Sequence, residues 1–341
     1  MKILYIGNTQ SPFNQLDMQM LRDEGNELKI IHHCPVSDGV TQYIKDYLRN
    51  SRDYIKWCDL VWVWFADIHA VPLIIQAHRL KKPVVVFCGD YEVNNAPDIK
   101  YGNQRLIFRG AITRWVLRNA DEVITPSYVT ARVIRSVEPV AVSFWDGEYF
   151  EGCKWMKVEP TIRISVIPWC VKKCEFGEEP DPPKENRVST ACGSINAYDR
   201  KGLGTFIDAT MDQPHRVSIL GDRNRVEYID ILKRSKVYCQ LSYPGTESFG
   251  VSLLEAMYYG CIPVITNDPA LQWVAGGTGI VVPYRDVLAT RKAIDMAMGM
   301  DGTAAMNRAH EFTYEQRLTA VRNLLSKYKT CERFKKCMCS I

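Results

Sequence analysis

The fold is decided by the stretch Pro244–Pro263, which reads PGTESFGVSLLEAMYYGCIP. Its spacing predicts a loop followed by a helix, with Glu247 at the junction and Glu255 two turns further along. Gly260 is the expected C-terminal stop of this helix, and the apolar run Ile262–Ile265 has the length and branching of a buried strand. A helix that leads directly into a buried strand is typical of an α/β domain with a parallel sheet.

The start of this helix has the chemistry of an anion site. The first N–H groups of a helix have no partner within the helix and lie at the positive end of its dipole, so they suit a phosphate. A carboxylate on the inner face of the helix can accept two hydrogen bonds from a vicinal diol such as a ribose. These features indicate a site for a nucleoside diphosphate that carries a sugar. The alternative is an amphipathic helix with both glutamates in solvent.

The whole run also resembles a signature of known enzymes. Glu247–Val264 is similar, almost position for position, to the E-x7-E element of the retaining glycosyltransferases of the group 1 (family 4) type, which have the two-domain GT-B fold. This resemblance implies that Glu255 binds the ribose hydroxyls of the donor and that Glu247 contacts the donor sugar as a catalytic residue. Backbone amides at the helix start would hold phosphate or sugar oxygens. The donor-binding residues implied there are Ser248, Phe249, Gly250 and Val251.

The diphosphate leaving group needs a second source of positive charge. A transferase neutralises the developing charge with a metal ion or with cations and backbone amides. The chain contains no Asp-x-Asp and no cluster with metal-ligand spacing, so we expect no metal and no cofactor, and the cationic route is favoured. Arg200 and Lys201 supply it, unless they are only surface charges. The pair resembles the end of the family's G-R-x(4–5)-K-G element, with Ser194 where the arginine usually stands. Gly221, at a strand end, could approach the base or ribose, or form only a turn.

The loop after the fourth predicted strand is the expected acceptor side of the site. It carries Asp90, which the resemblance implies is a catalytic residue and which could instead cap the next turn. Cys88 stands where the family often has a histidine. This departure and Ser194 leave a second interpretation open, a glycosyltransferase-like subunit that binds a nucleotide sugar without catalysis. A nucleotide-sugar epimerase shares the fold, but the E-x7-E run favours a transferase.

Apolar runs alternate with helical patterns along the chain, which predicts two Rossmann-like, doubly wound parallel-sheet domains facing across a cleft. Ligands bind such sheets at the carboxyl ends of the strands. The predicted strands of the first half are Lys2–Ile6, Glu27–His32, Asp59–Phe65, Pro83–Cys88, Glu122–Thr125 and Arg163–Pro168. Those of the second half are Val188–Cys192, Arg216–Leu220, Val237–Leu241, Ile262–Ile265 and Gly279–Val282.

A length of 341 residues suits two domains. The expected boundaries are 1–168 for an acceptor-side domain, 169–186 for a linker, 187–312 for a nucleotide-sugar-binding domain, 313–328 for a terminal helix and 329–341 for a disordered tail. Thr313 and Gln316 form a predicted capping box at the start of the terminal helix, which would cross back to the first domain. The segment Asp146–Glu159 breaks the pattern and fits a hairpin or a loop insertion.

Composition limits the classes of partner and the cellular location that we expect. No window approaches the roughly 18 apolar residues of a membrane span, so we expect a cytoplasmic protein. The net charge of +4 includes basic clusters, Arg105–Arg118 among them, that are either solvated faces or a peripheral contact with anionic lipid. No nucleic-acid module is present. The twelve cysteines form no disulfide or zinc framework. The expected partners are a nucleotide-sugar donor (UDP or GDP) and a carbohydrate, lipid-linked or small-molecule acceptor.

Overall fold

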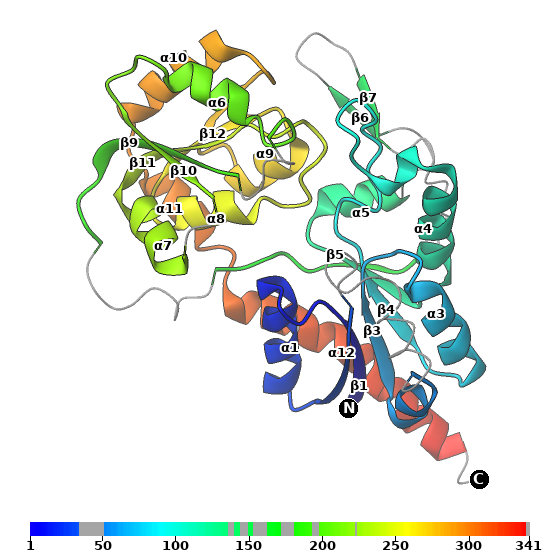
Figure 1. The fold of residues 1–341 in the computed structure, drawn as a ribbon. Helices are drawn as coiled ribbons and strands as arrows, with labels where there is room; N and C mark the ends of the chain where they lie inside the picture. The colour runs from blue at the N-terminus through cyan, green and yellow to red at the C-terminus, as the bar shows by residue number, and fades with distance from the viewer. Residues whose placement is uncertain are drawn as a thin grey trace.

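Two parallel sheets with helices on both faces make up two domains (Figure 1). A computed structural model of the chain describes residues 1–33, 51–135, 140–143, 149–152, 162–171, 181–192, 198–221 and 224–338. Both sheets are parallel throughout. The predicted α/β class, with two doubly wound domains, is therefore confirmed.

The first sheet has six strands in the order β2-β1-β3-β4-β5-β8. Its strands are β1 (Lys2–Gly7), β2 (Glu27–His32), β3 (Leu60–Trp64), β4 (Val84–Phe87), β5 (Glu122–Thr125) and β8 (Ile164–Val166). Its helices are α1 (Pro12–Asp23), α3 (Ala70–Arg79), the 3₁₀ turn η1 (Asn103–Arg105), α4 (Ile107–Asn119) and α5 (Tyr128–Arg135). Alternate residues of a strand point to opposite faces. Leu4 and Ile6 thus join the core under α3 and α4, whereas Ile3 and Tyr5 join the core on the side of α1.

The second sheet has five strands in the order β10-β9-β11-β12-β13. They are β9 (Glu185–Ala191), β10 (Arg216–Leu220), β11 (Ser235–Gln240), β12 (Ile262–Thr266) and β13 (Ile280–Val282). The helices are α6 (Leu203–Thr210), α7 (Arg225–Arg234), α8 (Val251–Tyr258), α9 (Pro269–Ala275), α10 (Val287–Met298) and α11 (Thr303–Ala309). The core under α6 and α10 is separate from the core under α8 and α9, so this sheet too is buried on both faces.

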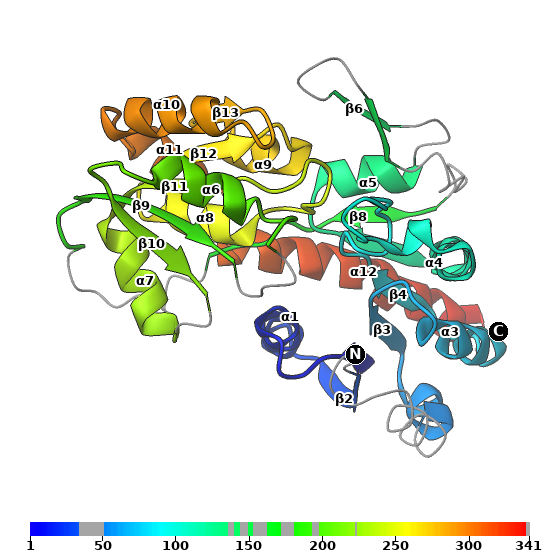
Figure 2. The ribbon, with the colours of Figure 1, turned by 45° about the horizontal axis from the view of Figure 1, so that its top comes forward.

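The last helix, α12 (Tyr314–Met338), belongs to the chain's end but packs on the first domain (Figures 1 and 2). The capping box is confirmed: the Gln316 amide N–H donates to Thr313 Oγ1 at 3.1 Å, and the Thr313 N–H donates back to Gln316 Oε1 at 3.4 Å. Arg317 donates to Asp17 Oδ1 of α1 at 2.6 Å, and both side chains are buried. The predicted crossing back to the first domain is what these contacts describe.

Several boundaries differ from the sequence prediction. The expected disordered tail from residue 329 is wrong as far as Met338, because α12 continues to that residue. Its segment 329–338 contains three lysines and one arginine and neither Gly nor Pro, so nothing in it stops a helix. β9 begins at Glu185, two residues inside the expected linker, of which 172–180 lies outside the described residues.

The irregular segment after α5 contains a hairpin. β6 (Val140–Ser143) pairs antiparallel with β7 (Tyr149–Gly152), so the hairpin alternative holds for the part of Asp146–Glu159 that is described. None of the helices within the described ranges is long and apolar enough to cross a membrane.

Candidate active site

The topology of the second sheet brings two distant loops together. With the order β10-β9-β11-β12-β13, the connections leave β9 and β11 toward opposite sides, and the carboxyl ends of these two neighbours are where a sheet of this topology forms its ligand-binding crevice. Arg200 and Lys201 follow β9, and Glu247 follows β11. Residues 46 positions apart in the chain thus reach one place because of the strand order.

Gly202 fixes how Lys201 enters the crevice. It is the N-cap residue of α6 and has a left-handed φ of 63°. A Cβ at this position would lie 2.0 Å from the backbone oxygen of Leu241, at the end of the neighbouring strand β11. Only glycine fits both the conformation and the contact. The close approach is further held by the N–H of Tyr243, which donates to the Arg200 carbonyl at 2.7 Å.

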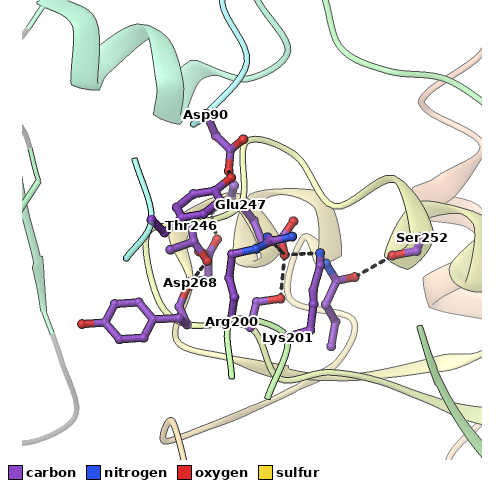
Figure 3. A network of polar contacts seen from close by, with 12 residues as sticks. Asp90, Arg200, Lys201, Thr246, Glu247, Ser252 and Asp268 are labelled. Atoms are coloured by element: carbon purple, nitrogen blue, oxygen red, sulfur yellow. Dashed lines mark hydrogen bonds and ion pairs between the residues drawn. The ribbon is translucent and has the colours of Figure 1, made fainter. Parts of the chain in front are cut away.

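The centre of the site is the carboxylate of Glu247 (Figure 3). Its Oε1 accepts from Lys201 Nζ at 2.5 Å and from the Ser242 hydroxyl at 2.6 Å, and it lies 3.6 Å from an Arg200 guanidinium nitrogen. Burial opposes the ionisation of Glu247, but the charges of Lys201 and Arg200 outweigh it and hold its pKa below the ordinary value. The crevice therefore contains an ionised carboxylate between two cations.

The first turn of α8 lies beside this cluster. Gly250 is the N-cap residue, with a φ of 91°, and a Cβ there would lie 2.6 Å from Leu271 Cδ2. The Phe249 ring is buried and packs edge-on against Trp273 and Phe312, at centroid distances of 5.7 and 5.4 Å. Phe249 can thus offer a ligand its backbone only. Its ring anchors the loop while the amides at the start of α8 remain directed out of the helix.

Two of the predicted donor contacts sit further along. Glu255 lies one turn into α8 and accepts from Arg225 of α7 at 2.6 Å, and Tyr228 also bonds to it. Gly221 follows the last residue of β10, on the same edge of the sheet. A carboxylate held by an arginine on one oxygen keeps lone pairs on the other, so Glu255 can still accept from a diol. Ser248 lies half-buried in the loop before α8, and Ser194 lies outside the described residues.

Asp90 reaches the site from the first domain. It follows β4, and its Oδ2 accepts from the Tyr101 hydroxyl at 2.8 Å. The guanidinium of Arg200 lies over the Tyr101 ring at 4.9 Å, so one arginine contacts both the first domain and Glu247. Burial raises the pKa of Asp90, with Arg200 counteracting part of the effect. The structure therefore brings Asp90, Arg200, Lys201 and Glu247 into one network across the two domains, as Figure 3 shows.

Three contributors were missed by the sequence analysis. Ser242 and Tyr101 carry hydroxyls with no diagnostic spacing, and their roles arise only from the fold. Asp268 accepts from the Gly245 N–H at 2.7 Å and from two amides at the start of α9, so it ties the loop before Glu247 to that helix. Burial, followed by the charge of Glu247, raises the pKa of Asp268 to about 7. Its sequence Asp-Pro is an N-cap signal that could have found it.

The carboxyl edge of the first sheet holds two further buried titratable groups. Glu92 Oε1 accepts from the Gly89 N–H at 3.1 Å and the Ala66 N–H at 3.3 Å, which joins the loops after β3 and β4. Burial raises its pKa to about 7. His69 Nε2 lies 2.7 Å from the Trp64 carbonyl, and burial lowers its pKa to about 4. His69 is thus neutral near pH 7. Among the described residues, no group of three or more His, Cys, Asp or Glu side chains could hold a metal ion.

Comparison with solved structures supports the architecture. Sucrose-phosphate synthase from Thermosynechococcus elongatus matches with a TM-score of 0.71 and 16% identity, over 97% of this chain and 100% of that one. HepE of Anabaena, in complex with UDP and glucose, matches with a TM-score of 0.64 and 14% identity, over 96% and 100%. Trehalose 6-phosphate synthase from Burkholderia multivorans matches with a TM-score of 0.58 and 12% identity, over 99% and 98%. These likenesses show the fold.

Comparison of sequences gives a family match over part of the chain. No curated protein matches the chain. Residues 207–317 match the family model described as "Glycosyl transferases group 1". This segment contains Glu247, the first turn of α8 and Glu255, which are the positions that carry the resemblance in the sequence. Residues 207–317 are thus similar to the group 1 glycosyltransferases, and the solved structures show that the chain has the two-domain GT-B fold.

Proposed function

We propose that this protein transfers a sugar from a UDP- or GDP-sugar to a hydroxyl acceptor with retention of anomeric configuration. In this reaction the bond between the anomeric carbon and the diphosphate oxygen breaks, and its electron pair leaves with the nucleoside diphosphate. The acceptor oxygen forms the new bond to the anomeric carbon, and its proton goes to the departing phosphate. A group that stabilises charge on that phosphate therefore accelerates the reaction.

The observation that carries the proposal is the pair of cations around Glu247. In the crevice between β9 and β11, Lys201 and Arg200 stand next to the first turn of α8, so cationic side chains and helix amides converge on one place. A diphosphate bound there would draw Lys201 away from Glu247, and the freed carboxylate would face the donor sugar. The cations supply the charge that a metal would otherwise supply, so the proposed reaction needs no metal and no cofactor.

The acceptor side of the proposal rests on the first domain. We assign the acceptor side to Asp90, which accepts a hydrogen bond from Tyr101 and lies close to Arg200. The proposed acceptor is a carbohydrate, a lipid-linked or a small-molecule hydroxyl. We place the enzyme in the cytoplasm, with a peripheral contact to a membrane surface through its basic segments.

Calorimetric titration with UDP and GDP tests the donor site. Lys201→Ala is expected to weaken binding by about 10- to 150-fold, because it removes a charged hydrogen bond to phosphate. Glu255→Ala should weaken binding through loss of the ribose contact. Lys292→Ala, an exposed lysine of α10, is the matched control and should bind like the wild type. Unchanged affinity in both site variants would overturn the assigned donor site.

Turnover separates an enzyme from a binding subunit. The protein is incubated with each UDP- or GDP-sugar that it binds, and release of the nucleoside diphosphate is followed with and without candidate acceptors. The anomeric configuration of the product, read by proton NMR, tests retention. Tight binding without transfer or donor hydrolysis would identify a nucleotide-sugar-binding subunit, the interpretation that Cys88 in the usual place of a histidine keeps open.

A further inference from the structure

The first domain carries an unusual group of exposed apolar side chains on α3 and α4. Ile107 and Phe108, at the start of α4, are 84% and 85% exposed, and Ile68, just before α3, is 60% exposed. Between the two helices runs an apolar groove of about 420 Å³ lined by Val71, Ile75, Ala111, Ile112 and Trp115. Ile68, Val71 and Ile75 follow one face of α3, and Phe108, Ile112 and Trp115 follow one face of α4. We call this surface the α3–α4 face.

Basic side chains outnumber acidic ones around this face. Neither α3 nor α4 contains an acidic residue, although together they contain four arginines. Arg109 is exposed at one end of the face, and Arg79 and Arg118 are exposed at the other. A carboxylate near this end, Asp121, is already engaged by His78 at 3.0 Å and by the Val84 N–H. Apolar side chains between cations are what an anionic lipid surface attracts, whereas a protein partner of ordinary composition needs no such bias.

The α3–α4 face is physically joined to the acceptor side of the site. The 3₁₀ turn η1, which leads into Ile107 and Phe108, is hydrogen-bonded to the loop that carries Asp90. The Asn103 N–H donates to the Tyr91 carbonyl at 2.8 Å, and the Gln104 side chain donates to the Glu92 carbonyl at 2.8 Å. A contact made by the start of α4 is therefore made next to the loop that the acceptor must approach.

We propose that the α3–α4 face rests on an anionic lipid surface, with Ile107 and Phe108 inserted among the headgroups and the arginines against lipid phosphates. The inference assigns the peripheral membrane contact proposed above to a defined surface, and it rests on the proposed glycosyltransferase only in placing the acceptor at this end of the first domain. It selects, among the acceptor classes, one that is presented at a membrane surface. A side chain at an interface contributes through the apolar area it buries and through each nearby cation.

Vesicle co-sedimentation of the full chain tests the inference. The wild type should sediment with vesicles that mix phosphatidylcholine and phosphatidylglycerol and remain in solution with phosphatidylcholine alone. The double variant Ile107→Ser/Phe108→Ser should lower the partition coefficient by about tenfold or more. Arg109→Gln should lower it by about fivefold, the loss of one cation near the surface. Rising salt should weaken binding of the wild type.

Matched controls come from the second domain. Leu288→Ser removes an apolar side chain that is 68% exposed on α10, and Lys292→Gln removes an exposed charge on the same helix; both should sediment like the wild type. Equal sedimentation of wild type and double variant would overturn the inference. So would no binding to anionic vesicles, or a dimer in size exclusion that the double variant abolishes, since the occupant would then be a second copy. UDP binding by the same variants is measured separately, so a failed donor site and a failed lipid surface are distinguishable.

Discussion

Replacing Arg317 by methionine is expected to lower the free energy of unfolding of the first domain by about 3–5 kcal/mol. The Arg317 and Asp17 side chains are 2% and 1% exposed, and their ion pair is 2.6 Å long. Arg317 also donates to the carbonyls of Ile167 and Pro168 at 2.8 and 2.7 Å and lies 4.0 Å over the Trp169 ring. The variant would leave a buried carboxylate without its counter-charge and two carbonyls without their donor, which accounts for the size of the loss.

The assay is urea unfolding followed by tryptophan fluorescence, which the Trp169 stack makes sensitive to this region. The control is Arg322→Met, because Arg322 also bonds a carboxylate, Glu24, but is 57% exposed. An exposed pair contributes no more than about 1 kcal/mol. The double variant Asp17→Asn/Arg317→Met removes both charges and should lose less than the sum of the single variants. Equal losses for Arg317→Met and Arg322→Met would refute the reasoning.

Three further outcomes follow from particular residues. Gly250→Ala forces a side chain into a φ of 91° and against Leu271. Thermal unfolding should therefore show a loss of roughly 1–2 kcal/mol or more in the free energy of unfolding, and calorimetry should show a loss of UDP binding. A variant as stable as the wild type and with full affinity would contradict this. Burial raises the pKa of Glu92 from 4.5 to about 7, so its contribution to stability is complete below pH 4.5 and falls by roughly 3 kcal/mol as the pH rises to 7. In urea unfolding at pH 5 and pH 8, the free energy of unfolding of Glu92→Gln should not show this loss. A variant whose free energy of unfolding falls as much between the two pH values as that of the wild type would contradict the prediction. Arg225→Ala removes a half-exposed ion-pair partner of Glu255. It should weaken UDP binding by up to about fivefold, which is less than the effect of Glu255→Ala. An effect equal to or larger than that of Glu255→Ala would mean that Arg225 itself contacts the ligand.

The strands could be predicted because burial requires apolar side chains at successive positions, and such runs are visible in the sequence. Strands covered on both faces are continuous apolar runs, and runs such as Pro83–Cys88 differ from the observed Val84–Phe87 by only a residue at each end. Short helices have no comparably clear pattern in the sequence. α11, with residues Thr303–Ala309, has too few turns for a helical period to stand out. α12 was placed too short because the cysteines and basic residues of its last ten positions were interpreted as a tail, although these positions contain good helix formers.

The identities of the site residues could be predicted better than the contacts between them. The residues of the E-x7-E run and Lys201 could be named in advance, and the strand order explains why they meet. That Lys201 pairs with Glu247, or that Arg225 pairs with Glu255, depends on loop geometry across 46 and 30 positions of the chain. Tyr101 had no signal at all, because a single hydroxyl acquires a role only from the carboxylate that the fold sets beside it.

The position of α12 has a consequence for how the protein is made. A ribosome releases the chain from its N-terminus, so the first domain emerges whole except for its last helix. The ion-pair partner of Asp17 is synthesised 300 residues later. Until Arg317 is synthesised, Asp17 lacks its counter-charge and the carbonyls of Ile167 and Pro168 lack this donor, so the nascent first domain is incomplete while the second domain is being translated. Completion of the first domain is thereby tied to the end of synthesis, and we expect a chain interrupted before Arg317 to be a target for chaperones or proteases.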